Sequence, residues 1–444
     1  MWTDSLGNPV TLRDAASHGA LNDFVEGFIA SEARAANILA AAQADHSPIV
    51  QAYAAAVHLF AESHDAAANA RPFIERALAG AASATEREQR MIAAVAAWAN
   101  GDITRAIALH EEQAREHPRD LASLKLGHYH LFNRGDSPGM LRMALPALPA
   151  AGDVPYLHGM LAFAWEQCHG LEQAEAAARK AIAMSRKEPW AHHALAHVML
   201  TRGRIAEGHA FLQDVSETWV GLNSFMVTHN WWHQALFALE LDRHEEVLAL
   251  YDRQVWGVAR DYTQDQINAV SLLARLELAG ADVGDRWQDL GRYLAGRTRD
   301  QVLPFLDMQY LYGLARAQRP ETDGLMRSIE ARAALEPDGV WMQVCRPASR
   351  GLRAYAEGDM ATTVRELGRA LPRMVEAGGS HAQRDLFSQV YLDALVRNGQ
   401  LSGAQHLLQQ QVRAQPESLR LRRQATGLYA SLGLESVSSN FFWS

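Results

Sequence analysis

The stretch GDITRAIALHEEQAREHP, residues 101–118, contains the pattern that decides the fold. It opens with Gly101, carries the small residue Ala106 near its start, and closes with Pro118, twelve residues after Ala106. Glycine commonly follows the last residue of a helix, and proline ends the next one. The stretch therefore predicts one short helix between two turns.

The same spacing recurs along the chain. Gly135 follows Gly101 by 34 residues and Gly203 lies two further periods on, whereas Gly170 misses the period by one residue. The stretch GQLSGAQHLLQQQVRAQP, residues 399–416, repeats the arrangement near the C-terminus. A period of 34 residues with two amphipathic helices in each unit is typical of the tetratricopeptide repeat.

Helix-forming residues dominate the periodic stretches, and we expect no strands because no β-branched run with hairpin turns occurs. The predicted fold is all-α, a right-handed α-solenoid of tetratricopeptide-like helix–turn–helix repeats that bury their apolar faces by stacking. We expect a single superhelical domain over residues 1–444. Its segments are irregular helical repeats over 1–86, regular units over 87–280, poorly registered helices over 281–344 and further units over 345–444.

Composition limits the function classes. The net charge is -9, and Lys and Arg alternate with Glu and Asp, as in EREQR, so nucleic acid is not an expected partner. No stretch approaches the ~20 apolar residues that span a bilayer, and we expect neither a membrane segment nor a secretory signal. Two cysteines in 444 residues favour a reducing, cytoplasmic location. The oligomeric state is left open.

Two histidine pairs are the most specific polar feature of the chain. His193 and His197 lie in WAHHALAHV, and His229 and His233 are the first and last residues of HNWWH. Residues four apart leave one face of a helix, and the repeat phase places both pairs on groove-lining first helices. We therefore expect four imidazoles to converge on the concave groove. Three other histidines of this region are expected at the surface: His192, His209 and His244.

Three interpretations of this cluster stay open. Neutral imidazoles can serve as acid and base in a groove poor in water, with Asn230 donating to a carbonyl and Trp232 as an apolar wall. The four histidines can instead hold a transition metal, with Glu166 on the preceding first helix as a carboxylate ligand, although no cofactor is required. A third interpretation is structural, with the imidazoles satisfying one another across packed helices.

A second candidate is GGSHAQRD, residues 378–385. Ser380 followed by Gln383 predicts a capping box at a helix start. His381 and Arg384 then fall in the first turn, where exposed N–H groups favour an anion and an arginine can clamp a carboxylate or phosphate. Alternatively, Arg384 forms a salt bridge with Asp385 or a neighbouring glutamate.

Several strings in order along the chain resemble the tetratricopeptide repeat protein 38 family, also called StaR-like repeat proteins. They are LHGMLAFAWE, WAHHALAHV, WWHQALFALE and GGSHAQRDLF. The resemblance implies a full-length helical repeat fold without a defined activity, and His128 matches the family pattern. In place of the family's F-x-D-x-H, the chain reads FLDMQ, so Gln309 replaces a histidine beside Asp307.

Two functions from different classes follow. The first is binding of a small, anionic or carbonyl-containing ligand in a His-lined concave pocket, with an acid–base or metal-assisted enzyme as an open extension. The second is a scaffold that binds a peptide or partner helix in its groove, the common use of such repeats. No phosphate-binding loop and no nucleophile elbow occur.

Overall fold

The structure, a computed structural model, describes residues 2–434 of the 444. The chain divides into two compact units. The first unit comprises Met1–Leu195 with Val215–Val227, and the second comprises Ala196–Asp214 with Thr228–Ser444. The division falls within two helices, α12 (Pro189–Thr201) and α14 (Ser224–Glu240).

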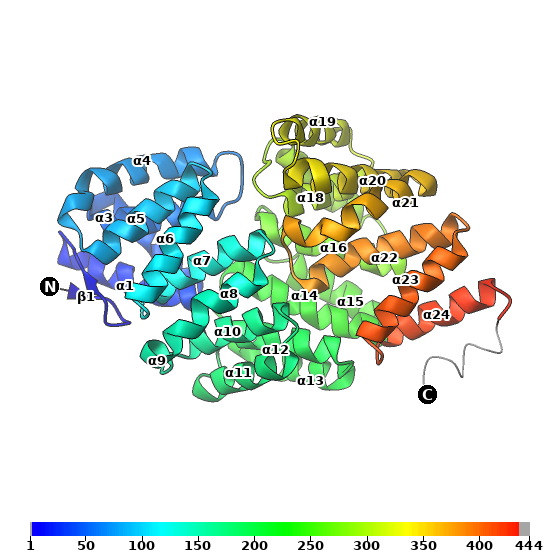
Figure 1. The fold of residues 1–444 in the computed structure, drawn as a ribbon, viewed down its shortest axis with the longest axis horizontal. Helices are drawn as coiled ribbons and strands as arrows, with labels where there is room; N and C mark the ends of the chain where they lie inside the picture. The colour runs from blue at the N-terminus through cyan, green and yellow to red at the C-terminus, as the bar shows by residue number, and fades with distance from the viewer. Residues whose placement is uncertain (1, 435–444) are drawn as a thin grey trace. The chain divides into compact units, whose positions relative to one another are not determined.

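The first unit consists of antiparallel helices stacked side by side (Figure 1). Its elements are β1 (Trp2–Thr3), β2 (Pro9–Val10), α1 (His18–Ala30), α2 (Ile38–Ala44), α3 (Pro48–Leu59), α4 (Ala66–Gly80), α5 (Glu86–Ala99), α6 (Ile103–Glu116), α7 (Leu121–Asn133), α8 (Ser137–Ala144), α9 (Leu148–Ala151), α10 (Pro155–Gln167), α11 (Leu171–Met184) and the start of α12.

The second unit continues the same helix–turn–helix arrangement. Beyond the remaining parts of α12 and α14, its elements are α13 (Ile205–Val215), α15 (His244–Leu250), α16 (Thr263–Leu278), α17 (Arg286–Leu294), α18 (Pro304–Arg316), α19 (Glu321–Ala334), α20 (Arg346–Glu357), α21 (Met360–Ala370), α22 (His381–Arg397), α23 (Leu401–Ala414) and α24 (Leu419–Ser431). Short 3-10 or π turns join some of these helices, for example Tyr251–Val255, Trp341–Cys345 and Leu371–Ala377.

The turn inside each regular helix pair contains one residue in the left-handed region. Gly101, Gly135 and Gly203 have φ values of 78°, 70° and 68°. In the pair α10–α11, the left-handed residue is His169, with φ 61°, and Gly170 has an ordinary φ of -80°. Left-handed residues therefore recur every 34 positions, at 101, 135, 169 and 203, without interruption. Gly170 misses the period because a histidine occupies the strained position.

The helix starts follow the phase of the repeat. First helices of successive pairs begin at Glu86, Leu121, Pro155 and Pro189. Ala106, one of the small residues that define the motif, is fully buried, as are Ala174 and Ala404 at matching positions. A side chain without bulk at this point lets the two helices of a pair approach closely. The all-α helical-repeat fold predicted from the sequence is confirmed.

Some details differ from the expectation. Residues 2–3 and 9–10 pair as a minimal antiparallel ribbon, whereas no strand was expected. The single continuous domain over 1–444 stays a prediction. None of the described helices combines the length and apolar character that crossing a bilayer requires.

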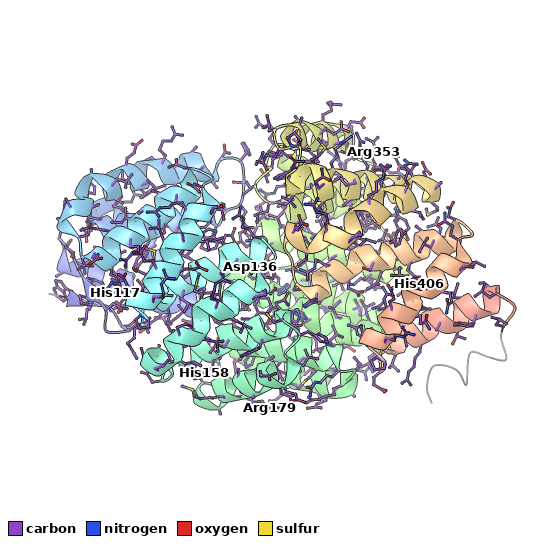
Figure 2. The ribbon with its side chains drawn as sticks, viewed as in Figure 1. His117, Asp136, His158, Arg179, Arg353 and His406 are labelled. Atoms are coloured by element: carbon purple, nitrogen blue, oxygen red, sulfur yellow. The ribbon has the colours of Figure 1, made fainter. Side chains whose placement is uncertain are left out.

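Arginine pairing on exposed helix faces agrees with the charge pattern of the sequence. Arg179 and Arg353, labelled in Figure 2, form i,i+4 ion pairs with Glu175 and Glu357, each at 2.7 Å. Such exposed pairs contribute little stability and offer no basic patch.

Candidate functional site

The second unit encloses a cavity of about 350 Å³. Its wall comes from α12, α14, α16, α22 and the N-terminal end of α24. Four leucines form an apolar side: Leu200, Leu236, Leu239 and Leu278. The polar side includes His197, Glu240, Arg275, His381, Asp385 and Arg420. A volume of this size with an apolar wall and a few charged groups is typical of small-ligand sites.

Arg275 is the one of these charged groups whose charge is buried and not paired. Arg275 is only 4% exposed. Its guanidinium donates to Ser271 Oγ and, at 2.6 Å, to the carbonyl of Ala382. Burial lowers the pKa of Arg275 to about 10, while Asp385 raises it and Arg420 lowers it further. No carboxylate of the described residues forms an ion pair with it. Arg275 therefore presents an uncompensated positive charge to the cavity at neutral pH.

Aromatic packing holds this charge in place. The Arg275 guanidinium lies 5.3 Å from the centroid of the Trp232 ring, which is fully buried. On the same ring, His229 stacks at 5.2 Å with an interplanar angle of 8°. A cation over an indole face is stabilised by the ring quadrupole. The helix α14 thus supports Arg275 through Trp232 and connects it to the histidines.

Three of the four predicted histidines lie together in the second unit. The ring centroids of His197 and His233 are 4.5 Å apart, and those of His233 and His229 are 4.9 Å apart. All three are buried, and His197 is the one that lines the cavity. The imidazoles therefore form a row that leads from the cavity wall into the core of the unit.

The inner end of this row is anchored by α16. His229 Nδ1 donates to Asn268 Oδ1 at 3.0 Å, because an amide oxygen only accepts. Asn268 Nδ2 in turn donates to Thr228 Oγ1 at 3.4 Å, and Thr228 Oγ1 donates to Asp265 Oδ1 at 2.8 Å. This chain places the proton of a neutral His229 on Nδ1 and leaves Nε2 as the basic nitrogen. Burial lowers the pKa of His229 to about 3, so this ring is neutral.

Two of the three carboxylates that line the cavity, Glu240 and Asp385, are paired with an arginine, whereas the third, Asp242, contacts His244. Glu240, at the C-terminal end of α14, accepts from Ser418 Oγ and from the backbone N of Arg420 at 3.0 Å. The Arg420 guanidinium reaches Glu240 at 3.4 Å and Asp385 at 3.1 Å. Arg423 donates to the carbonyl of Glu240 at 3.1 Å. These contacts join α24 to α14. The positive charge of Arg420 is balanced by two carboxylates, whereas the charge of Arg275 is not balanced.

The start of α22 has the geometry that GGSHAQRD predicts. Ser380 caps the helix and Gln383 completes the capping box. His381 and Asp385 line the cavity, as does His197. Arg384, expected to clamp an anion, instead donates to the carbonyls of Gly378 and Gly379 within its own loop. Arg275 lines the cavity, whereas Arg384 does not.

Three predicted residues lie in the first unit. His193 packs with Phe163 and Trp190, at centroid distances of 5.0 and 5.3 Å. Glu166 is buried and accepts from the amide of Gln167. His128 Nε2 contacts the carbonyl of Met140 at 2.9 Å, and burial lowers its pKa to about 4. His128 has the environment of a neutral structural histidine.

Three further polar residues of the second unit are buried away from the cavity lining. Asn230 is fully buried, and neither amide atom has a hydrogen-bond partner among the described residues. Asp307 accepts from Gln301 at 2.8 Å, and burial raises its pKa to about 8. Gln309, which stands where the family has histidine, is also buried.

The expectation that His192 and His209 lie at the surface is wrong. His192 is fully buried and accepts from the indole N–H of Trp219 at 3.2 Å. His209 is buried against α15 and contacts Glu246 at 2.7 Å. Both form local pairs that spacing alone did not reveal. His244 is partly exposed and lies 3.2 Å from Asp242.

Sequence reasoning missed Arg275, Arg420 and Glu240. A signal for Arg275 was present, because it is a lone cation inside the apolar run VSLLARLEL, where helix geometry buries it. Arg420 and Glu240 gave no such signal. They are 180 residues apart and meet only because α24 returns to α14.

No known protein-family model matches the chain. Among solved structures, the chain is similar to "Structure of Naa15/Naa10 bound to HypK-THB", with 12% identity and a TM-score of 0.25. That match covers 96% of this chain and 67% of that chain. The TPR domain of P58(IPK) matches with 12% identity and a TM-score of 0.23, over 71% of this chain and 99% of that chain. TM-scores this low carry no weight for the function of this chain.

Proposed function

We propose that the second unit binds a small monocarboxylate with an apolar body in its cavity. The single observation that carries this proposal is Arg275, a buried and unpaired guanidinium on the cavity wall. A carboxylate there gains charge-assisted hydrogen bonds in a site of low dielectric. The leucine side of the cavity favours an alkyl or aryl body, and the pairing of Glu240 and Asp385 with Arg420 disfavours a cationic ligand.

Isothermal titration calorimetry with octanoate tests this function, and octanamide serves as an uncharged ligand of the same shape. We expect saturable binding of octanoate and much weaker binding of octanamide. Arg275→Gln is expected to weaken octanoate binding by about 10- to 100-fold, the effect of losing one charge-assisted contact.

Arg260→Gln is the matched control, because Arg260 also lies over a tryptophan of this unit, 5.5 Å from Trp256, but does not line the cavity. The control is expected to bind octanoate as the unchanged protein does. Equal affinity for octanoate and octanamide, or equal losses in the two variants, would contradict the proposal.

Acid–base or metal-assisted catalysis at this site is an extension of the same proposal. This extension assigns the catalytic roles to His193, His197, His229 and His233, of which His197 lines the cavity. A transition metal on His193, His197, His229 and His233 stays a prediction, for which elemental analysis of the purified protein is the direct measurement. Membership of the tetratricopeptide repeat protein 38 family and a cytoplasmic location are also proposals, supported by the quoted strings and by two free cysteines.

A second candidate function is docking of a peptide or partner helix. It is favoured by partly buried aromatic rings at the end of α3 and on the alternate helices α5 and α7 of the first unit. Phe60 lies 5.1 Å from Trp98, and Trp98 lies 5.4 Å from Tyr129. Lys125 lies nearby on α7 but is engaged with backbone carbonyls of α1. If docking is the only function, octanoate gives no saturable heat and Arg275→Gln changes nothing.

A further inference from the structure

The helix α24 forms one side of the cavity and packs apart from the main core of the second unit. Arg420, Arg423 and Gln424 on α24 line the cavity. The main core is a cluster that includes Leu236 on α14. The buried apolar residues of α24 belong to a separate, smaller cluster with residues of α22 and α23; on α24 they are Leu421, Ala425 and Leu428. The buried apolar packing of α24 therefore holds it to α22 and α23.

Polar contacts at one end of α14 hold α24 against the cavity. The carboxylate of Glu240 accepts from Ser418 Oγ at 3.2 Å and from the backbone N of Arg420 at 3.0 Å. The Arg423 guanidinium donates to the carbonyls of Glu240 and Leu239, at 3.1 and 3.3 Å. Leu239 and Glu240 are the last two residues of α14. These hydrogen bonds therefore converge on a single point of the cavity wall.

A second contact of α24 lies at the turn between α12 and α13. Gly203 in this turn has a left-handed φ of 68°, and a Cβ added there would collide with the Cβ of Glu417. Glu417 directly precedes Ser418, the N-cap residue of α24. The start of α24 therefore rests on Gly203, and this close approach requires a residue without a side chain.

We propose that α24 is a lid, which opens when its contacts with Glu240 and Gly203 break and closes over a bound ligand. This inference rests on the proposed binding function and adds the route by which the ligand enters. Water replaces hydrogen bonds that break on opening, whereas nothing compensates the exposure of apolar area. An element held by polar contacts therefore opens more readily than one held in a core, and lids of binding sites are typically such elements.

A ligand needs an opening of this kind to reach Arg275, which is 4% exposed. Three other helices that line the cavity contribute buried side chains to the main core, namely Leu236 on α14, Leu273 on α16 and Phe387 on α22. Moving any of these three helices would break apolar packing of the main core. Among these four walls, α24 is the one whose displacement leaves the main core intact.

Hydrogen–deuterium exchange of the full chain, followed by mass spectrometry, tests the lid. We expect the amides of residues 419–431 to exchange at least ~10-fold faster than those of residues 263–278 in α16. Octanoate at about ten times its dissociation constant is expected to slow exchange over 419–431 by ~10-fold, because it binds the closed form.

Gly203→Ala displaces Glu417 without changing a residue of the cavity lining. It is expected to speed exchange over 419–431 by at least ~5-fold, with exchange over 263–278 unchanged. Arg423→Gln provides a second variant if Gly203→Ala does not fold, since Arg423 is exposed. Loss of its bonds to α14 is expected to speed exchange over 419–431 by about 2- to 10-fold.

Gly101→Ala is the matched control, because Gly101 has the same place in its turn, a φ of 78° and no atom within 4 Å of an added Cβ. It is expected to leave exchange over 419–431 and the affinity for octanoate unchanged. Saturable octanoate binding that does not slow exchange over 419–431 overturns the lid and leaves the binding function standing. Equal acceleration in Gly203→Ala and Gly101→Ala also overturns the lid. Absence of any saturable heat with octanoate overturns the binding function itself.

Discussion

Two buried arginines of this protein have opposite roles. Arg87 in the first unit is paired with Asp120 at 2.8 Å, and both side chains are 2% exposed. Arg275 in the second unit has hydrogen bonds to neutral acceptors and a contact with Trp232, without an ion pair among the described residues. A paired buried charge holds the fold together, whereas an unpaired one lowers stability unless a ligand compensates it. In the proposed function, Arg275 is therefore the residue where stability is given up for binding.

This difference predicts opposite effects on stability at the scale of the residue. Arg87→Gln leaves Asp120 as an uncompensated buried charge and is expected to lower the free energy of unfolding by about 3–5 kcal/mol. Arg275→Gln removes a charge that had no partner, so the expected change is below ~1 kcal/mol. Urea denaturation followed by circular dichroism measures both. A loss in Arg275→Gln as large as in Arg87→Gln would show that Arg275 is a structural residue.

At the scale of the element, the helix pair is set by its turn. One left-handed residue lets the second helix fold back on the first, and a side chain at that position costs about 1 kcal/mol or more. Gly101 occupies this position in α5–α6, and His169 occupies it in α10–α11. The latter pair keeps its geometry because α11 buries Ala174 and Ala178 against its neighbours. Packing overrides the local preference of the histidine.

The turn residues predict a matched pair of stability changes. His169→Gly is expected to raise the free energy of unfolding by ~0.5–1 kcal/mol, because it removes left-handed strain. Gly101→Ala introduces the same strain where no atom lies within 4 Å of the added Cβ, so a loss of about 1 kcal/mol is expected. Gly203→Ala should cost more, because its Cβ would also collide with Glu417. Thermal unfolding ranks the three, and a destabilised His169→Gly would contradict this account of the turn.

At the scale of the whole molecule, local pattern and long-range contact differ in how well the sequence predicts them. The helix pairs follow from spacing, because Gly101 and Pro118 act on neighbouring residues. His229 and His233 were found because helix periodicity places both on one side of α14. The contacts of Glu240 with Ser418 and Arg420 were not predictable, since they join segments that no period relates. Whether a buried arginine lacks an ion pair depends on where carboxylates from distant segments lie, as Glu240 and Asp385 do beside Arg420. The sequence therefore predicts an anion contact at Arg384 and gives none at Arg275.

The measurement that tests the central claim most directly is a crystal structure of the protein with a terminally brominated octanoate. The anomalous signal of bromine marks the alkyl end of the ligand without reference to any assumed pose. We expect the bromine among Leu200, Leu236 and Leu278, with the carboxylate within hydrogen-bonding distance of the Arg275 guanidinium. A bromine signal confined to other surfaces, or a carboxylate that does not contact Arg275, would contradict the claim.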